Sequence, residues 1–290
     1  MPPRLLARDK QKRGLVMNKI PAAVAEGALQ PGECYLCDTP ILKAHSGSQP
    51  DLFLRWNLIP LPVAAVDVVV HLHGFSRAGA GMPLAEKVAR SGLDLSRRRR
   101  PTLAVLPRGN WLRYTWYDFA ALLAGGVEQL IDYALAGLAA AFAGTVPQRD
   151  RTILTAHSGG GMPAIDLLEG MREPPDELHI FDGLYGRDPA SGDPMRGLET
   201  VDRWLAGRLA GEPSRRGALR VVYIEQQTGP FSRRVGELIA NRLAAFAASD
   251  LADLRRRYRT ERSPIQHARI AERCGPDLLA DAGIEFDWWR

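Results

Sequence analysis

Short apolar runs alternate with longer amphipathic stretches along most of this 290-residue chain. The most apolar run, residues 63–73, reads VAAVDVVVHLH, which is typical of a strand buried on both faces of a parallel sheet. Strands that alternate with helices of 10–20 residues predict βαβ units. We therefore expect an α/β protein with a mostly parallel central sheet and helices on both faces, in three layers.

The same pattern gives the expected elements. Besides the central run, strands are predicted over residues 51–59, 102–106, 151–156, 177–181, 219–225 and 256–262. Helices are predicted over residues 82–91, 118–142, 160–171, 199–210, 231–248 and 268–281, the last interrupted near Gly275-Pro276.

Before residue 51 the pattern is weak. This part has a charged start, an Ala-rich stretch and short strand-like pieces, so we expect a peripheral segment over 1–50 and one large domain over 51–290. Cys34 and Cys37 have CxxC spacing but are flanked by turn residues and lack a second Cys or His pair. This favours a turn-flanked strand, and no metal site is expected.

Composition narrows the class of protein. The net charge of +5 comes mostly from arginine, and the run of arginines at 97–100 is interpreted as a solvated loop, so no nucleic-acid partner is expected. No window holds the ~18 consecutive apolar residues of a membrane span, and the start lacks the apolar region of a secretory signal. Three cysteines cannot form a disulfide framework. We expect a cytoplasmic protein.

A second apolar run stops at a serine. Residues 152–161 read TILTAHSGGG, which is typical of a nucleophile elbow, where a strand turns sharply into a helix and presents one hydroxyl. The turn crowds the positions two before and two after the serine, and these are Ala156 and Gly160. The usual G-x-S-x-G thus appears as A-x-S-x-G. We predict that Ser158 is a nucleophile.

A serine nucleophile needs a base and an acid that orients it. His267 follows the last predicted strand, which is where a doubly wound hydrolase would place its base. Two carboxylates compete for the role of acid. Asp182 ends the predicted strand 177–181 and precedes a glycine, whereas Glu225 ends the strand 219–225. We favour Asp182 and keep Glu225 as the alternative.

An oxyanion hole requires two backbone N–H groups aimed at one point. The first is expected from Gly159, at the start of the elbow helix, where free N–H groups and the helix dipole favour negative charge. The second is expected from Phe75 or Ser76, in the loop that leaves the central strand after His73-Gly74.

These segments together resemble the α/β-hydrolase superfamily. The resemblance rests on the strand HLHGF at 71–75, the elbow AHSGG at 156–160 and the late His267, and covers roughly residues 50 to 285. It implies a covalent acyl-enzyme and no cofactor. The segment FDGLYG at 181–186 also resembles the acid segment of some bacterial hydrolases of this class, which supports Asp182. In many members the acid follows the next strand, so Glu225 stays open.

The expected substrate pocket is formed by loops at the carboxyl ends of the strands. Its predicted lining residues are His73, Gly74, His157, Trp111, Trp116 and Tyr185. The alternative for the aromatic residues is core packing between the loop and the long helix. The resulting hypothesis is a carboxylesterase-type serine hydrolase acting on a small-molecule acyl substrate. The alternatives are an acyltransferase or peptidase with the same triad, and a non-catalytic binding protein on a hydrolase fold. The oligomeric state stays open.

Overall fold

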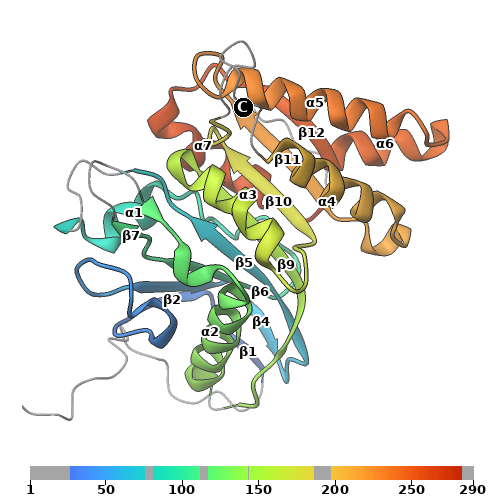
Figure 1. Ribbon diagram of the computed structural model, residues 1–290. Coiled ribbons are helices and arrows are strands. Elements are labelled where there is room, and N and C mark those ends of the chain that lie inside the picture. The colour runs from blue at the N-terminus through green and yellow to red at the C-terminus, as the bar shows by residue number, and fades with distance from the viewer. Residues whose placement is uncertain (1–26, 76–80, 112–116, 143, 186–196, 283–290) are drawn as a thin grey trace, which may run out of the picture.

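The apolar run expected as a central strand lies in the middle of the main sheet (Figure 1). The computed structural model describes residues 27–75, 81–111, 117–142, 144–185 and 197–282. The strands of the main sheet follow the spatial order β12-β11-β10-β9-β5-β6-β3-β2. They are β2 (Gly32–Leu36), β3 (Leu52–Trp56), β5 (Ala65–Leu72), β6 (Thr102–Pro107), β9 (Gln148–His157), β10 (Glu177–Phe181), β11 (Ala218–Tyr223) and β12 (Tyr258–Arg262).

The sheet is mostly parallel, as predicted. The six strands from β12 to β6 run parallel, while β3 pairs antiparallel with both β6 and β2. Two short antiparallel pairs lie outside it. The first joins β1 (Gly27–Leu29) to β4 (Ile59–Leu61), and the second joins β7 (Asn110–Trp111) to β8 (Tyr117–Asp118).

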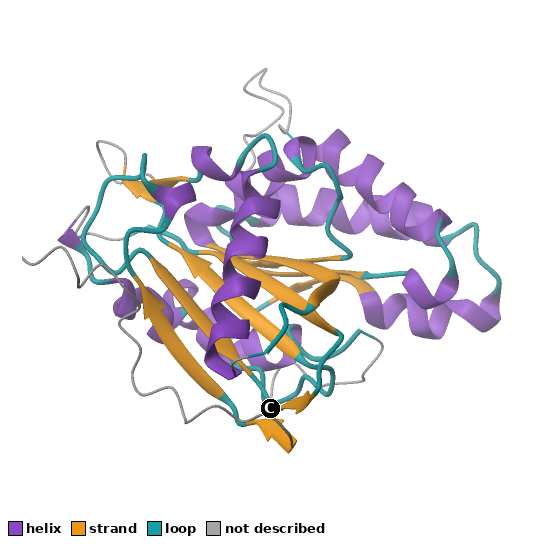
Figure 2. Cartoon of the chain, turned by 90° about the horizontal axis from the view of Figure 1, so that it is seen from below, coloured by secondary structure: helices purple, strands orange, loops and turns teal. Residues whose placement is uncertain are grey.

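Helices cover both faces of the sheet (Figure 2). One face packs against α2 (Gly126–Phe142), α3 (Gly161–Gly170), α4 (Leu198–Ala210) and α5 (Gly229–Leu243). The other packs against α1 (Leu84–Arg90) and α7 (His267–Leu278). A further helix, α6 (Ala248–Arg257), packs along β11 and β12. This arrangement confirms the predicted three-layer α/β class.

The two faces carry separate cores because side chains alternate along each strand. Val68 and Val70 of β5 join the large apolar cluster under α2 and α3, whereas Val69 joins a smaller cluster under α1. The α1 and α7 face also receives buried polar side chains, among them His71 and Thr155. Most of the apolar burial is therefore on one face, and the polar groups near the candidate site come from the other.

The boundary expected at residue 50 needs correction. Residues Gly32–Leu36 form β2, which pairs with β3 along its whole length and is an edge strand of the main sheet. Cys34 and Leu36 of this strand are buried, so it belongs to the core rather than to a peripheral segment. Cys34 and Cys37 are free thiols.

Two helix boundaries also differ from expectation. The helix expected over 118–142 begins only at Gly126, because the chain turns at Ala124 and Gly125, both with positive φ. The helix α7 continues through Pro276 instead of breaking there. Among the described residues, no helix is long and apolar enough to cross a membrane.

Candidate active site

Ser158 lies where β9 turns into the short helix η4 (Ser158–Gly160) that leads into α3. Its φ of 51° is in the left-handed region, which a non-glycine residue adopts only under constraint. Close packing supplies that constraint. A Cβ on Gly160 would lie 2.3 Å from the carbonyl oxygen of Leu72, so only glycine fits there. The local geometry is therefore that of a strand-to-helix elbow that lifts the serine out of the sheet.

Three side chains from distant parts of the chain meet at this elbow. The Ser158 Oγ lies 2.8 Å from His267 Nε2, and His267 Nδ1 lies 2.6 Å from Asp182 Oδ2. Because a carboxylate can only accept, Nδ1 carries the proton toward Asp182 and Nε2 is left to accept the serine hydroxyl. His267 is the first residue of α7, and Asp182 follows β10 directly. The order in the chain is serine, acid, histidine.

The Asp182 carboxylate is fully buried and held by further donors. Its Oδ1 accepts the backbone N–H of Ile224 at 2.9 Å and the hydroxyl of Thr228. Glu225 is placed differently. Its side chain is 42% exposed and forms ion pairs with Arg233 and Arg262. The structure thus brings Asp182 to His267 and leaves Glu225 on the surface.

The backbone expected to bind an oxyanion lies beside the serine. A Cβ on Gly159 would sit 3.6 Å from the backbone nitrogen of Phe75, and a Cβ on Gly74 would sit 2.6 Å from Ser158 Cβ. The loop after β5 therefore approaches the elbow as closely as its backbone permits. Ser76, the other expected donor, lies outside the described residues.

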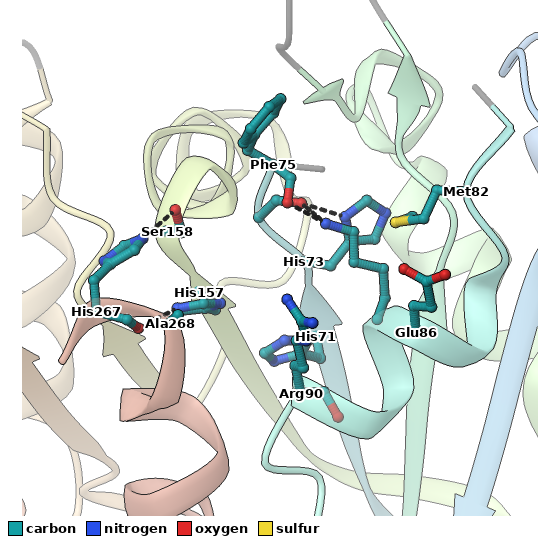
Figure 3. A pocket seen from close by; sticks show the side chains of 13 residues that line it. His71, His73, Phe75, Met82, Glu86, Arg90, His157, Ser158, His267 and Ala268 are labelled. Atoms are coloured by element: carbon teal, nitrogen blue, oxygen red, sulfur yellow. Dashed lines mark hydrogen bonds between the residues drawn. The ribbon is translucent and has the colours of Figure 1, made fainter. Parts of the chain in front are cut away.

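The ring of His157 lies beside that of His267. His157 Nε2 lies 3.2 Å from the carbonyl oxygen of His267, and the two imidazoles have centroids 5.1 Å apart (Figure 3). Burial, reinforced by His267, lowers the pKa of His157 to about 4. His157 is then neutral at physiological pH, and its Nε2–H donates to the His267 carbonyl.

Two more neutral histidines lie under the loop after β5. His73 Nε2 accepts the backbone N–H of Gly109 at 2.9 Å, so its Nδ1–H donates to the Gly74 carbonyl. Burial holds the pKa of His73 well below its usual value. Burial also lowers the pKa of His71 to about 3, and this ring contacts Thr155 Oγ1 at 2.8 Å.

A cavity of about 610 Å³ opens beside Ser158. Its walls come from the end of β5, the elbow, α1 and the start of α7, as Figure 3 shows. The lining residues are His71, His73, Gly74, Phe75, Met82, Glu86, Lys87, Arg90, Ser91, His157, Ser158, His267 and Ala268.

The expected lining residues are only partly in this cavity. His73, Gly74 and His157 line it, whereas Trp111 packs against the large apolar core instead. The Tyr185 hydroxyl lies 3.3 Å from Ser158 Oγ. Trp116 lies outside the described residues. Within the described part of the chain, no group of three or more His, Cys, Asp or Glu side chains is arranged to hold a metal ion.

Lys87 was not among the residues predicted from the sequence to form the site. Its side chain is buried, and its ammonium donates to the carbonyl oxygens of Gly74, at 2.5 Å, and Phe75. A signal was present in the sequence. Lys87 falls between Leu84 and Val88 at the spacing of one helix face, and these are the buried positions of α1.

These features define the class of the fold. A mostly parallel sheet with an antiparallel second strand carries a serine elbow after its fifth strand in chain order, an aspartate after the sixth and a histidine after the last. This is the α/β-hydrolase fold.

Several solved structures are similar to this chain at low sequence identity. No protein-family model and no curated protein matches the chain. Among solved structures, it is similar to an S-formylglutathione hydrolase from Agrobacterium tumefaciens at 14% identity and a TM-score of 0.44, covering 91% of this chain and 96% of that one. A ferulic acid esterase has 11% identity and a TM-score of 0.45, with 88% and 98% covered. A bacterial heroin esterase has 14% identity and a TM-score of 0.42, with 91% and 86% covered.

Proposed function

We propose that this protein is a serine hydrolase that cleaves a carboxylic ester or related acyl bond of a small molecule through an acyl-enzyme. The observation that carries the proposal is the continuous hydrogen-bonded chain from Ser158 Oγ through His267 to Asp182, at 2.8 and 2.6 Å. Both distances are within the range in which a base activates a nucleophile and an acid orients the base.

In the first half of the reaction, Ser158 Oγ attacks the substrate carbonyl carbon while His267 Nε2 takes its proton. The resulting imidazolium is stabilised by the buried Asp182 carboxylate, which stays ionised. His267 then donates the proton to the leaving alcohol, and the acyl group remains on Ser158. The backbone N–H groups of Gly159 and Phe75 are the proposed donors to the tetrahedral oxyanion.

In the second half, water replaces the alcohol. The His267 side chain is 35% exposed, so solvent reaches the base from which a hydrolytic water would be activated. His267 takes a proton from that water, the hydroxide attacks the acyl carbon, and the proton returns to Ser158 as the carboxylic acid leaves. Ready access of water to the base favours hydrolysis over transfer to another acceptor.

The proposal is tested with a fluorophosphonate probe and a short series of p-nitrophenyl esters. Wild type should be labelled once and should release p-nitrophenol, whereas Ser158→Ala should not be labelled. The kcat of Ser158→Ala should fall by roughly 10³-fold or more, because Ser158 and His267 act as a unit. Ser96→Ala changes an exposed serine and is the matched control. Labelling of Ser158→Ala equal to that of wild type would contradict the proposed function.

A further inference from the structure

The side chain of Lys87 points from α1 to the loop that follows β5. The residue lies on the buried face of the helix and is 9% exposed. Its ammonium donates to two successive main-chain carbonyls, those of Gly74 and Phe75. A lysine is rarely buried to this extent, because its charged form loses hydration. Burial, with Arg90 as the second cause, lowers the pKa of Lys87 to about 7.

The two carbonyls fix the direction of the N–H groups beside them. In a trans peptide the C=O and N–H bonds point to opposite sides of the same plane. Since the Gly74 carbonyl points to Lys87, the N–H of Phe75 in the same peptide points away from α1. On that side lies the elbow, where the Phe75 nitrogen is 3.6 Å from the Cβ position of Gly159.

The Gly74 carbonyl is held from a second direction. His73 Nδ1–H donates to the same oxygen at 2.9 Å, and His73 is itself fixed by the backbone N–H of Gly109. Figure 3 shows His73 and Phe75 on one side of the cavity, with Ser158 and His267 on the other. His73 restrains one carbonyl of the loop, whereas Lys87 bridges two and adds a positive charge.

We propose that Lys87 is a positioning residue that clamps the Gly74 and Phe75 carbonyls, so that the N–H of Phe75 is held and polarised as an oxyanion donor. This rests on the proposed function, because an oxyanion forms only if Ser158 attacks a carbonyl. An ammonium that draws electron density from a peptide oxygen makes the N–H of that peptide a stronger donor. The stabilisation is specific to the transition state and acts on kcat.

If Lys87 acts through its positive charge, kcat should depend on the protonation of its side chain. The other groups facing its ammonium are Glu86 and Arg90 on α1, with His71, His73 and His157 from β5 and the elbow. The three histidines have lowered pKa values and are neutral near pH 7. Lys87 is charged below pH 7 and loses its charge as the pH rises past that value. We therefore expect kcat to fall on the alkaline side.

The test compares Lys87→Met, Lys87→Arg and the exposed control Lys43→Met in ester hydrolysis. Lys87→Met keeps the apolar stem and removes both donors, so kcat should fall about 10- to 100-fold with KM within about 3-fold, somewhat less than the loss of a direct oxyanion donor. Lys87→Arg keeps charge and donors at all pH values, so it should recover part of kcat and lose the alkaline fall. Lys43→Met should match wild type. Equal kcat values for Lys87→Met and wild type would overturn the proposal.

A second readout does not depend on activity. Amide hydrogen exchange in the segment around Gly74 and Phe75 should be faster in Lys87→Met than in wild type, while Lys43→Met leaves it unchanged. If fluorophosphonate fails to label Ser158, the proposed function fails. If labelling succeeds and the exchange and kcat of Lys87→Met stay at wild-type values, only the role of Lys87 fails. Circular dichroism melting of each variant shows whether a lost rate comes from unfolding.

Discussion

At the scale of single residues, the two candidate acids have very different surroundings. Asp182 is fully buried, accepts two bonds through Oδ1 and points Oδ2 at His267. The Glu225 side chain is exposed and forms ion pairs with Arg233 and Arg262. A carboxylate that orients a base must be rigid and turned toward the imidazole, and of the two only Asp182 meets both conditions.

Replacement of each acid should therefore have unequal effects. Asp182→Asn keeps the shape of the side chain but turns an N–H or a weaker acceptor toward His267 Nδ1. This favours the His267 tautomer with its proton on Nε2, which cannot accept the proton of Ser158. The kcat should therefore fall by roughly 10³- to 10⁴-fold. Glu225→Gln removes exposed ion pairs and should leave kcat within about 2-fold. The measurement is kcat for one p-nitrophenyl ester with both variants. A larger loss in Glu225→Gln than in Asp182→Asn would reverse the assignment.

The sequence predicted site residues where a strand end or a turn marked them. Ser158, His267 and Asp182 each stand at such a place, and the structure brings the three side chains together. It could not predict contacts that depend on packing between distant elements. Lys87 reaches the loop after β5 only because α1 lies across that end of the sheet. Trp111 was expected in the pocket because it follows a strand, but it is partly buried and packs against the large apolar core.

At the scale of elements, the elbow depends on close backbone packing. A Cβ at position 160 would meet the Leu72 carbonyl oxygen at 2.3 Å and the His73 carbonyl oxygen at 2.9 Å. Neither atom can move without displacing β5 or the loop that follows it. Gly160, two residues after the serine, is thus required by the sheet beneath it as much as by the turn.

Gly160→Ala should accordingly displace the elbow and lower both kcat, by about 10-fold or more, and the melting temperature. Gly207→Ala is the matched control, since a Cβ at this exposed position of α4 meets no atom within 4 Å. There alanine should raise stability by roughly 0.5–1 kcal/mol through its helix propensity. Thermal melting and kcat of the two variants check this. An unchanged kcat in Gly160→Ala would show that the elbow tolerates the methyl group.

Element boundaries show where local sequence rules fail. The strand at Glu177–Phe181 appears as predicted, because its five residues are too few for a helix and are followed by the turn residues Asp182 and Gly183. The break expected at Gly275-Pro276 does not occur. A Cβ on Gly275 would lie 2.1 Å from the Gly92 carbonyl oxygen, so this glycine serves the packing of α7 against the loop after α1. Such a tertiary reason is not visible in a local pattern.

At the scale of the whole molecule, the strand order places the candidate site residues at the carboxyl ends of three neighbouring strands. The elbow, Asp182 and the loop after β5 follow the neighbouring strands β9, β10 and β5, so their carboxyl ends lie side by side. The alternation of strands and helices predicted this parallel core. It predicted a turn-flanked strand near Cys34 but not that this strand, β2, joins the main sheet, because an edge strand before the first crossover lacks the long apolar run that marks a central strand.

The same sheet buries neutral histidines, which makes stability depend on pH. Burial lowers the pKa of His71 to about 3 and of His179 to about 4, against about 6.5 when unfolded. The unfolded chain therefore binds more protons below pH 6.5, and stability falls as the pH drops from there toward 4. We expect the melting temperature to be lower at pH 4.5 than at pH 7 by roughly 10 °C.

Calorimetry at the two pH values measures this difference. His179→Gln keeps an N–H donor for Glu177 and removes one titrating ring, so its melting temperature should fall less steeply with acidification. Equal melting temperatures of the wild type at pH 7 and pH 4.5 would contradict the burial of neutral histidines.

If the proposed function is right, Ser158 carries the acyl group during turnover. The most direct measurement is mass spectrometry of the enzyme quenched with acid within milliseconds of mixing with a p-nitrophenyl ester, followed by peptide mapping. We expect the added mass of the acyl group on the peptide that contains Ser158, and no adduct in Ser158→Ala. Turnover of the ester with the acyl group on another residue, or at an undiminished rate in Ser158→Ala, would contradict it.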